Sequence, residues 1–219
     1  MPQVDPKKNN MEMLFPEFGP MRIKYKDIFD MKEFYDAVHE WILEHDYAAY
    51  DGDLEMWETY YGERVSQSGA KEIWIRWRIK KGAPDSPTFI ISGKKNPAIV
   101  YHMDLDFHCV ALTKAEVVKE GRKMKVHKGE VELHIRPYVE EAYLKHFSKN
   151  IFLKQIQNIF QKRIYRKKFE ERKKELYKES YALNNFIKQW FKLKRYLPYE
   201  ESKNFFPSYA WPSHLREDK

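Results

Sequence analysis

Hydrophobic residues recur at helical spacing in one early segment of the chain, DMKEFYDAVHEWILEH, which begins at Asp30. Intervals of three and four residues place apolar side chains on one helix face. The residues on this face are Phe34, Val38, Trp41 and Ile42. Asp30 stands at the N-cap position and Glu33 follows three residues later, which is the spacing of a capping box. The segment therefore predicts a capped amphipathic helix, and the stretch MRIKYKDIF before it predicts a short strand.

The hydrophobic period changes to two between about Leu54 and Tyr143. In KEIWIRWRIK and in IVYHMDLDFHCVAL, apolar residues alternate with polar ones, as in strands that bury one face. The stretch RKMKVHKGEVELHIRP predicts a hairpin that turns at Lys128 and Gly129. Together with LEMWETYYGERV, these stretches predict four or five antiparallel strands.

No glycine or proline occurs between Pro137 and Pro198. A long stretch without a breaker, rich in Lys, Glu, Leu and Gln, predicts helix over about residues 148–196. Asn184 and Asn185 are the one candidate interruption. The sequence therefore allows either a continuous helix or a helical hairpin.

The order of these elements predicts an α+β fold in which a twisted antiparallel sheet of 4–5 strands carries one capped N-terminal helix and a long basic C-terminal helix. The chain divides into an N-terminal arm (1–20), a sheet domain (21–147), the long helix or hairpin (148–197) and an aromatic, proline-rich C-terminal arm (198–219).

Positive charge is concentrated in the predicted C-terminal helix. The 219 residues have a formal net charge of +7, and the segment 145–195 holds 16 basic and 4 acidic residues, a balance of +12 that leaves −5 for the remainder. This asymmetry fits an acidic partner, an anionic polymer, or an acidic surface of the same fold.

Cysteine content and apolar run lengths indicate the compartment. Cys109 is the only cysteine, which excludes an intrachain disulfide and favours a reducing environment. No apolar run approaches the length of a membrane span, and the first twenty residues lack the apolar core of a signal peptide. We expect a cytoplasmic protein, or one within an intracellular assembly, with no signal peptide and no membrane span.

The order and residue composition of the segments resemble those of a loose group of uncharacterised archaeal proteins. The resemblance is carried by the helix DMKEFYDAVHEWILEHDY, by strands such as KEIWIRW and by the lysine-rich helix, and it covers about residues 21–195. It implies the fold plan described above. Because it contains no diagnostic motif, it implies no functional residue, and both arms depart from it.

Four potential metal ligands lie on one face of the predicted strand that contains HMDLDFH. They are His102, Asp104, Asp106 and His108. Imidazole and carboxylate groups bind divalent metals, but four side chains along one extended strand cannot converge on one ion. We therefore favour a polar sheet face in which Asp104 and Asp106 pair with arginines, and we predict no cofactor.

Catalytic signatures are absent from the sequence. It contains no G-x-S-x-G, no G-x-x-x-x-G-K-[ST] and no dinucleotide-binding fingerprint. Cys109 falls on the apolar side of its strand, where a thiol is usually buried and inert. We predict that the protein is not an enzyme, and we identify no catalytic residue.

Residues 162–179 hold nine basic and four acidic side chains. The basic side chains could contact phosphates in a nucleic-acid-binding accessory protein with weak sequence specificity. The candidates for these contacts are Lys162, Arg163, Arg166, Lys167, Arg172 and Lys173. The interleaved glutamates, which follow or precede basic residues at a spacing of four, favour a solvated helix face instead.

An apolar line recurs every seven residues along the predicted long helix, and this spacing suits contact with another helix. The line consists of Phe169, Leu176, Leu183 and Trp190. The arms add aromatic side chains of the types enriched in protein interfaces. These are Phe15, Phe18, Phe205, Phe206, Tyr209 and Trp211.

From these features we predict a non-enzymatic structural or assembly subunit that binds itself as a homo-oligomer or joins a larger protein assembly. In the opposing interpretation, the arms and the heptad line cover the chain's own core. Nucleic-acid binding is one further alternative. A small-ligand or metal site on the sheet is another, as is an apolar pocket between sheet and helix lined by residues such as Trp41, Trp77 and Phe107.

Overall fold

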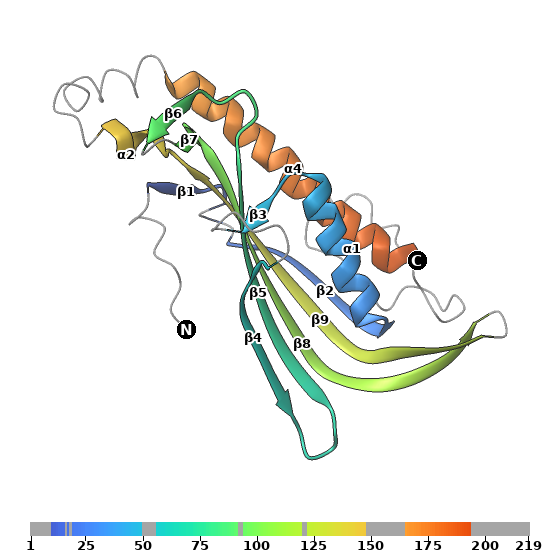
Figure 1. The fold of residues 1–219 in the computed structure, drawn as a ribbon. Helices are drawn as coiled ribbons and strands as arrows, with labels where there is room; N and C mark the ends of the chain where they lie inside the picture. Colours follow the sequence, from blue (N-terminus) through green and yellow to red (C-terminus); the bar gives the residue numbers. More distant parts are fainter. Residues whose placement is uncertain are drawn as a thin grey trace.

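The chain combines helices with a mostly antiparallel sheet, in agreement with the predicted α+β class (Figure 1). The computed structural model describes residues 10–15, 17, 19–49, 56–91, 94–119, 122–147 and 165–193. The helices are α1 (Met31–Glu44), α2 (Tyr143–Phe147) and α4 (Arg166–Leu193). The strands of the main sheet are β1 (Met11–Met13), β2 (Met21–Phe29), β3 (Ala48–Ala49), β4 (Glu58–Val65), β5 (Lys71–Gly82), β8 (Val100–Lys119) and β9 (Arg122–Glu140).

The main sheet has the strand order β1-β9-β8-β5-β3, with β2 also paired to β9 and β4 also paired to β5. It therefore has seven strands within the described residues, whereas the hydrophobic pattern predicted four or five. The difference arises partly because β1 and β3 are only three and two residues long, too short to show a period. A separate two-stranded ribbon consists of β6 (Thr88–Ile91) and β7 (Lys94–Pro97).

Helix α1 begins where the capping pattern predicts. The side chain of Asp30 accepts hydrogen bonds from the backbone N–H groups of Lys32 and Glu33, at 2.9 and 3.3 Å. These bonds satisfy two donors that have no partner within the helix. The apolar face of α1, including Phe34, Val38 and Ile42, is buried against the sheet and α4.

The predicted hairpin at Lys128 and Gly129 is wrong, because β9 passes through both residues without turning. Gly129 instead lies opposite a bulge, where Ala111 and Leu112 of β8 face this single residue and Ala111 adopts a φ of 53°. A Cβ atom at position 129 would lie 2.9 Å from Leu112 Cδ2 and 3.0 Å from the Ala111 carbonyl oxygen. Glycine is therefore required here for packing, and the bulge bends the β8–β9 ribbon (Figure 1).

Helix α4 is continuous through Asn184 and Asn185 and packs on the same side of the sheet as α1, against β9 and β2 (Figure 1). Asn184 is buried rather than exposed at a turn. The hairpin alternative therefore does not apply at this position. The predicted beginning of the helix, near residue 148, lies outside the described residues.

The heptad line of α4 is buried in the core of its own chain. Leu176 and Leu183 are fully buried, and Phe169 and Trp190 are each 8% exposed. The ring of Trp190 lies 5.1 Å from that of Phe34 in α1, measured between centroids. Four of the predicted interface residues are thus occupied by packing within the chain.

The residues proposed to line a pocket between sheet and helix form part of this core. Trp77 and Phe107 are 0% and 1% exposed, with ring centroids 5.0 Å apart, and Trp41 is also buried. Cys109 is buried beside Met31, as its position on the apolar side of the strand predicts. Burial raises the pKa of its thiol to about 12, so the thiol is protonated at neutral pH.

Candidate functional site

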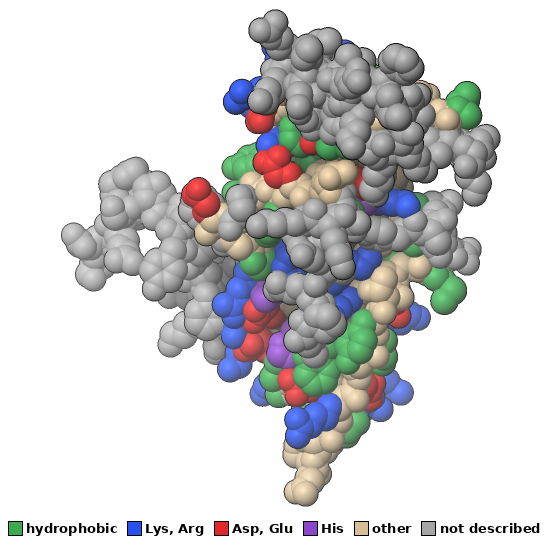
Figure 2. All heavy atoms as spheres, turned by 90° about the vertical axis from the view of Figure 1, so that its left-hand side faces the viewer, with side chains coloured by type: hydrophobic (Ala, Val, Ile, Leu, Met, Phe, Trp, Pro, Cys, Tyr) green, Lys and Arg blue, Asp and Glu red, His purple; other side chains and the backbone are tan. Residues whose placement is uncertain are grey.

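The face of the sheet opposite the helices carries rows of charged side chains. Residues that are neighbours across strands share a face, and every second residue along a strand lies on it. Basic, acidic and histidine side chains gather next to one another in the space-filling view (Figure 2). We call this surface the polar sheet face. On β5, β8 and β9 in turn, the neighbours across strands form three rows: Lys80, His102 and Tyr138; Arg78, Asp104 and Arg136; and Arg76, Asp106 and His134.

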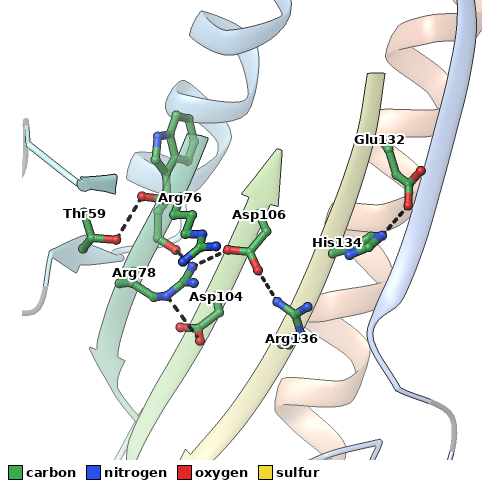
Figure 3. Close-up of polar contacts among 9 residues, drawn as sticks. Thr59, Arg76, Arg78, Asp104, Asp106, Glu132, His134 and Arg136 are labelled. Carbon is green, nitrogen blue, oxygen red and sulfur yellow. Dashed lines mark hydrogen bonds and ion pairs between the residues drawn. The ribbon is translucent and has the colours of Figure 1, made fainter. Parts of the chain in front are cut away.

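Two arginines hold the two aspartates at the centre of this face (Figure 3). Arg78 Nη1 lies 2.8 Å from Asp106 Oδ1, and Arg78 Nε lies 3.4 Å from Asp104 Oδ2. Arg136 donates to the second oxygen of Asp106. The predicted pairing of both carboxylates with arginines is therefore confirmed.

The two aspartates differ in their protonation equilibrium although they are two residues apart. Burial raises the pKa of Asp104 to about 6, since Arg78 offsets the cost of desolvation only in part and the charge of Asp106 adds to it. Burial also acts to raise the pKa of Asp106, but the ion pairs with Arg78 and Arg136 outweigh it and hold this pKa below its ordinary value. Of the two, Asp104 is thus the carboxyl group whose charge changes nearer to neutral pH.

Each of the four candidate metal ligands pairs with another side chain of the same face. His102 Nε2 lies 2.6 Å from Glu140 Oε2, and His108 Nε2 lies 2.9 Å from Glu72 Oε1. Asp104 and Asp106 face the arginines. Within the described residues, no three histidine, cysteine, aspartate or glutamate side chains stand close enough together to hold a metal ion.

A cavity of about 610 Å³ lies at the end of the polar sheet face where β1 and β3 are found. Its lining includes the buried pair His102 and Glu140, which are 1% and 6% exposed, together with Lys80. The β6–β7 ribbon contributes Phe89 and Asn96. The sequence predicts His102 as a candidate ligand, but no local pattern predicts the cavity, because its walls come from strands far apart in the chain.

The basic residues proposed to contact phosphates are partly engaged with carboxylates of the same chain. Arg172 pairs with Glu175 at 2.7 Å, and Lys173 Nζ lies 2.6 Å from Glu12 of β1. Arg166 and Lys167 are exposed on α4. The candidates Lys162 and Arg163 lie outside the described residues.

One of the predicted arm residues packs on α4. The ring of Phe15 lies 5.5 Å from that of Tyr177 and 6.3 Å from that of Tyr181. Both tyrosines are partly exposed. The other predicted arm residues lie outside the described part of the chain. These are Phe18, Phe205, Phe206, Tyr209 and Trp211.

Strand β4 presents exposed aromatic and aliphatic side chains that the sequence analysis did not identify as a site. Within the described strands, β4 pairs with β5 alone, so its other edge has no described neighbour. Tyr60, Tyr61 and Val65 are 42%, 53% and 56% exposed. The signal in the sequence is ETYYGERV itself, a strand-forming stretch whose alternation is weak because neither face of β4 is buried.

Comparison of the chain with family models, with curated proteins and with solved structures finds no match. No helix in the described part of the chain combines the length and the apolar content needed to cross a membrane. What the protein does is therefore inferred from its own geometry.

Proposed function

We propose that this protein is a non-enzymatic assembly subunit that binds a second copy of itself along strand β4. The observation that carries the proposal is the exposed aromatic edge of this strand, with Tyr60 and Tyr61 about half exposed. An unpaired strand edge offers a row of backbone donors and acceptors that a further strand can satisfy.

The sequence of β4 favours a second copy of the chain as the occupant. In an antiparallel pair centred on Tyr61, this residue faces its own copy across a twofold axis. Aromatic pairs directly across strands stabilise a sheet.

Natural sheets use charges and bulges to prevent edge pairing, and β4 has both. A register shift separates Glu58 from Tyr60, and the strand carries three charged residues. These features discourage pairing with an arbitrary strand. The pairing about Tyr61 uses the part of β4 beyond the bulge, where the register with β5 is regular.

The substitution Tyr61→Lys tests the proposal, because it places two ammonium groups opposite each other at the centre of the pair. Sedimentation velocity at two protein concentrations should show dimer for the native chain and a dissociation constant raised at least about tenfold for the variant. Tyr177→Lys is the matched control, since Tyr177 is 44% exposed on α4, and it should leave the dimer intact. A native chain that stays monomeric at high concentration, or a Tyr61→Lys dimer of native affinity, would contradict the proposal.

The C-terminal arm is a second predicted contact, and its aromatic residues support the same function. Deleting residues 198–219 should reduce the mass of any assembly larger than a dimer while leaving a folded chain. An assembly of unchanged mass would remove the arm from the proposal and leave β4 as its basis.

A further inference from the structure

The cavity at the end of the polar sheet face is built from strands that are far apart in sequence. Its floor lies on β3, β5, β8, β9 and β1, where Gly82, Val100, Glu140 and Met11 are successive cross-strand neighbours. The side chains of Gly82 and Val100 are small, so they leave a depression between their larger neighbours. A volume of about 610 Å³ falls within the range of roughly 300–1,000 Å³ typical of small-molecule sites.

One side of the cavity is apolar. Phe89 and Pro97 of the β6–β7 ribbon form this wall, and Met11 of β1 lies at the far end of the floor. Gly82 allows the ribbon to approach the sheet, because a Cβ atom there would lie 3.1 Å from Cγ of Pro97. The wall suits a hydrocarbon or aromatic group.

The remaining lining carries charges of both signs. Asp46 and Glu140 contribute carboxylates, and Lys80 and Lys81 contribute ammonium groups. Lys81 forms an ion pair with Glu179 of α4.

The buried pair His102 and Glu140 shows that the site is held in place. Glu140 is 6% exposed and its carboxylate lies 2.6 Å from His102 Nε2. Lys80 stands directly across from His102 on the neighbouring strand. A buried carboxylate fixed in this way presents its charge without needing to reorganise, which favours binding of a complementary group.

From this geometry we propose that the cavity binds a small zwitterion with an apolar side group, the chemistry of an apolar amino acid. Its carboxylate faces Lys80, its ammonium group faces the carboxylate of Glu140, and its side group packs on Phe89 and Pro97. A ligand that carries only one of the two charges forms only one of these ion pairs, so it binds more weakly. The site is separate from strand β4 and does not depend on self-association.

Isothermal titration calorimetry with three phenyl compounds tests the charge requirement. L-phenylalanine carries both charges, phenylacetate lacks the ammonium group, and phenethylamine lacks the carboxylate. Phenylalanine should bind saturably with one site per chain, and each of the other two should bind at least about tenfold more weakly. Equal binding of phenylacetate or phenethylamine would overturn the proposal, as would the absence of saturable binding of phenylalanine, leucine and tryptophan at millimolar concentration.

Two variants and one control locate the binding in the cavity. Lys80→Gln should weaken phenylalanine at least about tenfold while leaving phenethylamine nearly unchanged, because only the carboxylate loses its partner. Val100→Trp fills the floor and should abolish binding of all three compounds. Lys114→Gln, on the exposed part of β8, should leave every affinity unchanged. Native affinity in folded Val100→Trp would contradict the proposal, and if that variant fails to fold by circular dichroism, the Lys80→Gln result decides.

Discussion

Asp104 and Asp106 are identical side chains on one strand, yet their pKa values are shifted in opposite directions. The carboxylate of Asp106 forms ion pairs with two arginines. Asp104 is the more buried carboxyl and faces Arg78 at the longer distance of 3.4 Å. The balance between desolvation and ion pairing decides the direction of each pKa shift. The pair therefore provides an internal test of the charge network.

Asp104→Asn should change the pH dependence of stability. The pKa of Asp104 is raised from 3.8 to about 6, so its contribution to stability is fully present below about pH 4 and is lost as pH rises through about 6. Asparagine does not titrate. Urea denaturation should therefore show the free energy of unfolding of the variant rising relative to the native chain by about 3 kcal/mol across this interval.

Asp106→Asn is the control with the opposite sign. The lowered pKa of Asp106 gives a contribution that is present above its ordinary pKa and is lost as pH falls through the folded value. This variant should be less stable than the native chain at neutral pH and should approach it in acid. The same pH dependence in both variants would contradict the assignment of the ion pairs.

At the scale of elements, the apolar face of α4 is an internal surface. Leu183→Ala should reduce the free energy of unfolding by about 2–5 kcal/mol at any protein concentration, because it leaves a cavity in the core of one chain. Lys178→Ala, at an exposed position of the same helix, should change it by no more than about 0.5 kcal/mol. A Leu183→Ala chain of native stability that fails to dimerise would show that the heptad line faces a partner.

Gly129→Ala should disturb the bend of the β8–β9 ribbon. The added methyl group would lie closer to Leu112 and to the Ala111 carbonyl than side chains normally approach, so one strand must shift. Urea denaturation should show a loss of about 1–3 kcal/mol, typical of an overpacked site. A variant as stable as the native chain would mean that the bulge is not fixed by this glycine.

The sequence predicts elements well where one side of an element is buried and poorly elsewhere. The helical spacing of apolar residues in α1 and the alternation in β5 and β8 each follow from contact with a single apolar layer, and the cap at Asp30 is a local hydrogen-bonding pattern. A glycine between two alternating runs predicts a turn at Gly129, whereas the register with β8 is a long-range property that no local pattern carries. The cavity around His102 and Glu140 was missed for the same reason.

At the scale of the whole molecule, the basic charge of the C-terminal helix is distributed among internal ion pairs and solvent. Arg172 and Lys173 already contact carboxylates of the chain, so two of the candidate cations are partly neutralised before any phosphate binds. Gel-shift titration with duplex DNA and with single-stranded RNA should show weak binding without sequence preference. Sub-micromolar, sequence-selective binding at physiological salt would contradict this prediction.

The central claim is that two copies of the chain pair through β4 about Tyr61, and oxidative cross-linking tests it most directly. Tyr61→Cys places two thiols opposite each other on the twofold axis, whereas the native Cys109 is buried, so mild oxidation should join two variant chains through one disulfide. Tyr177→Cys, at an exposed position of α4, is the control and should stay largely unlinked at the same protein concentration. A Tyr61→Cys chain that cross-links no faster than the control would contradict the proposed pairing.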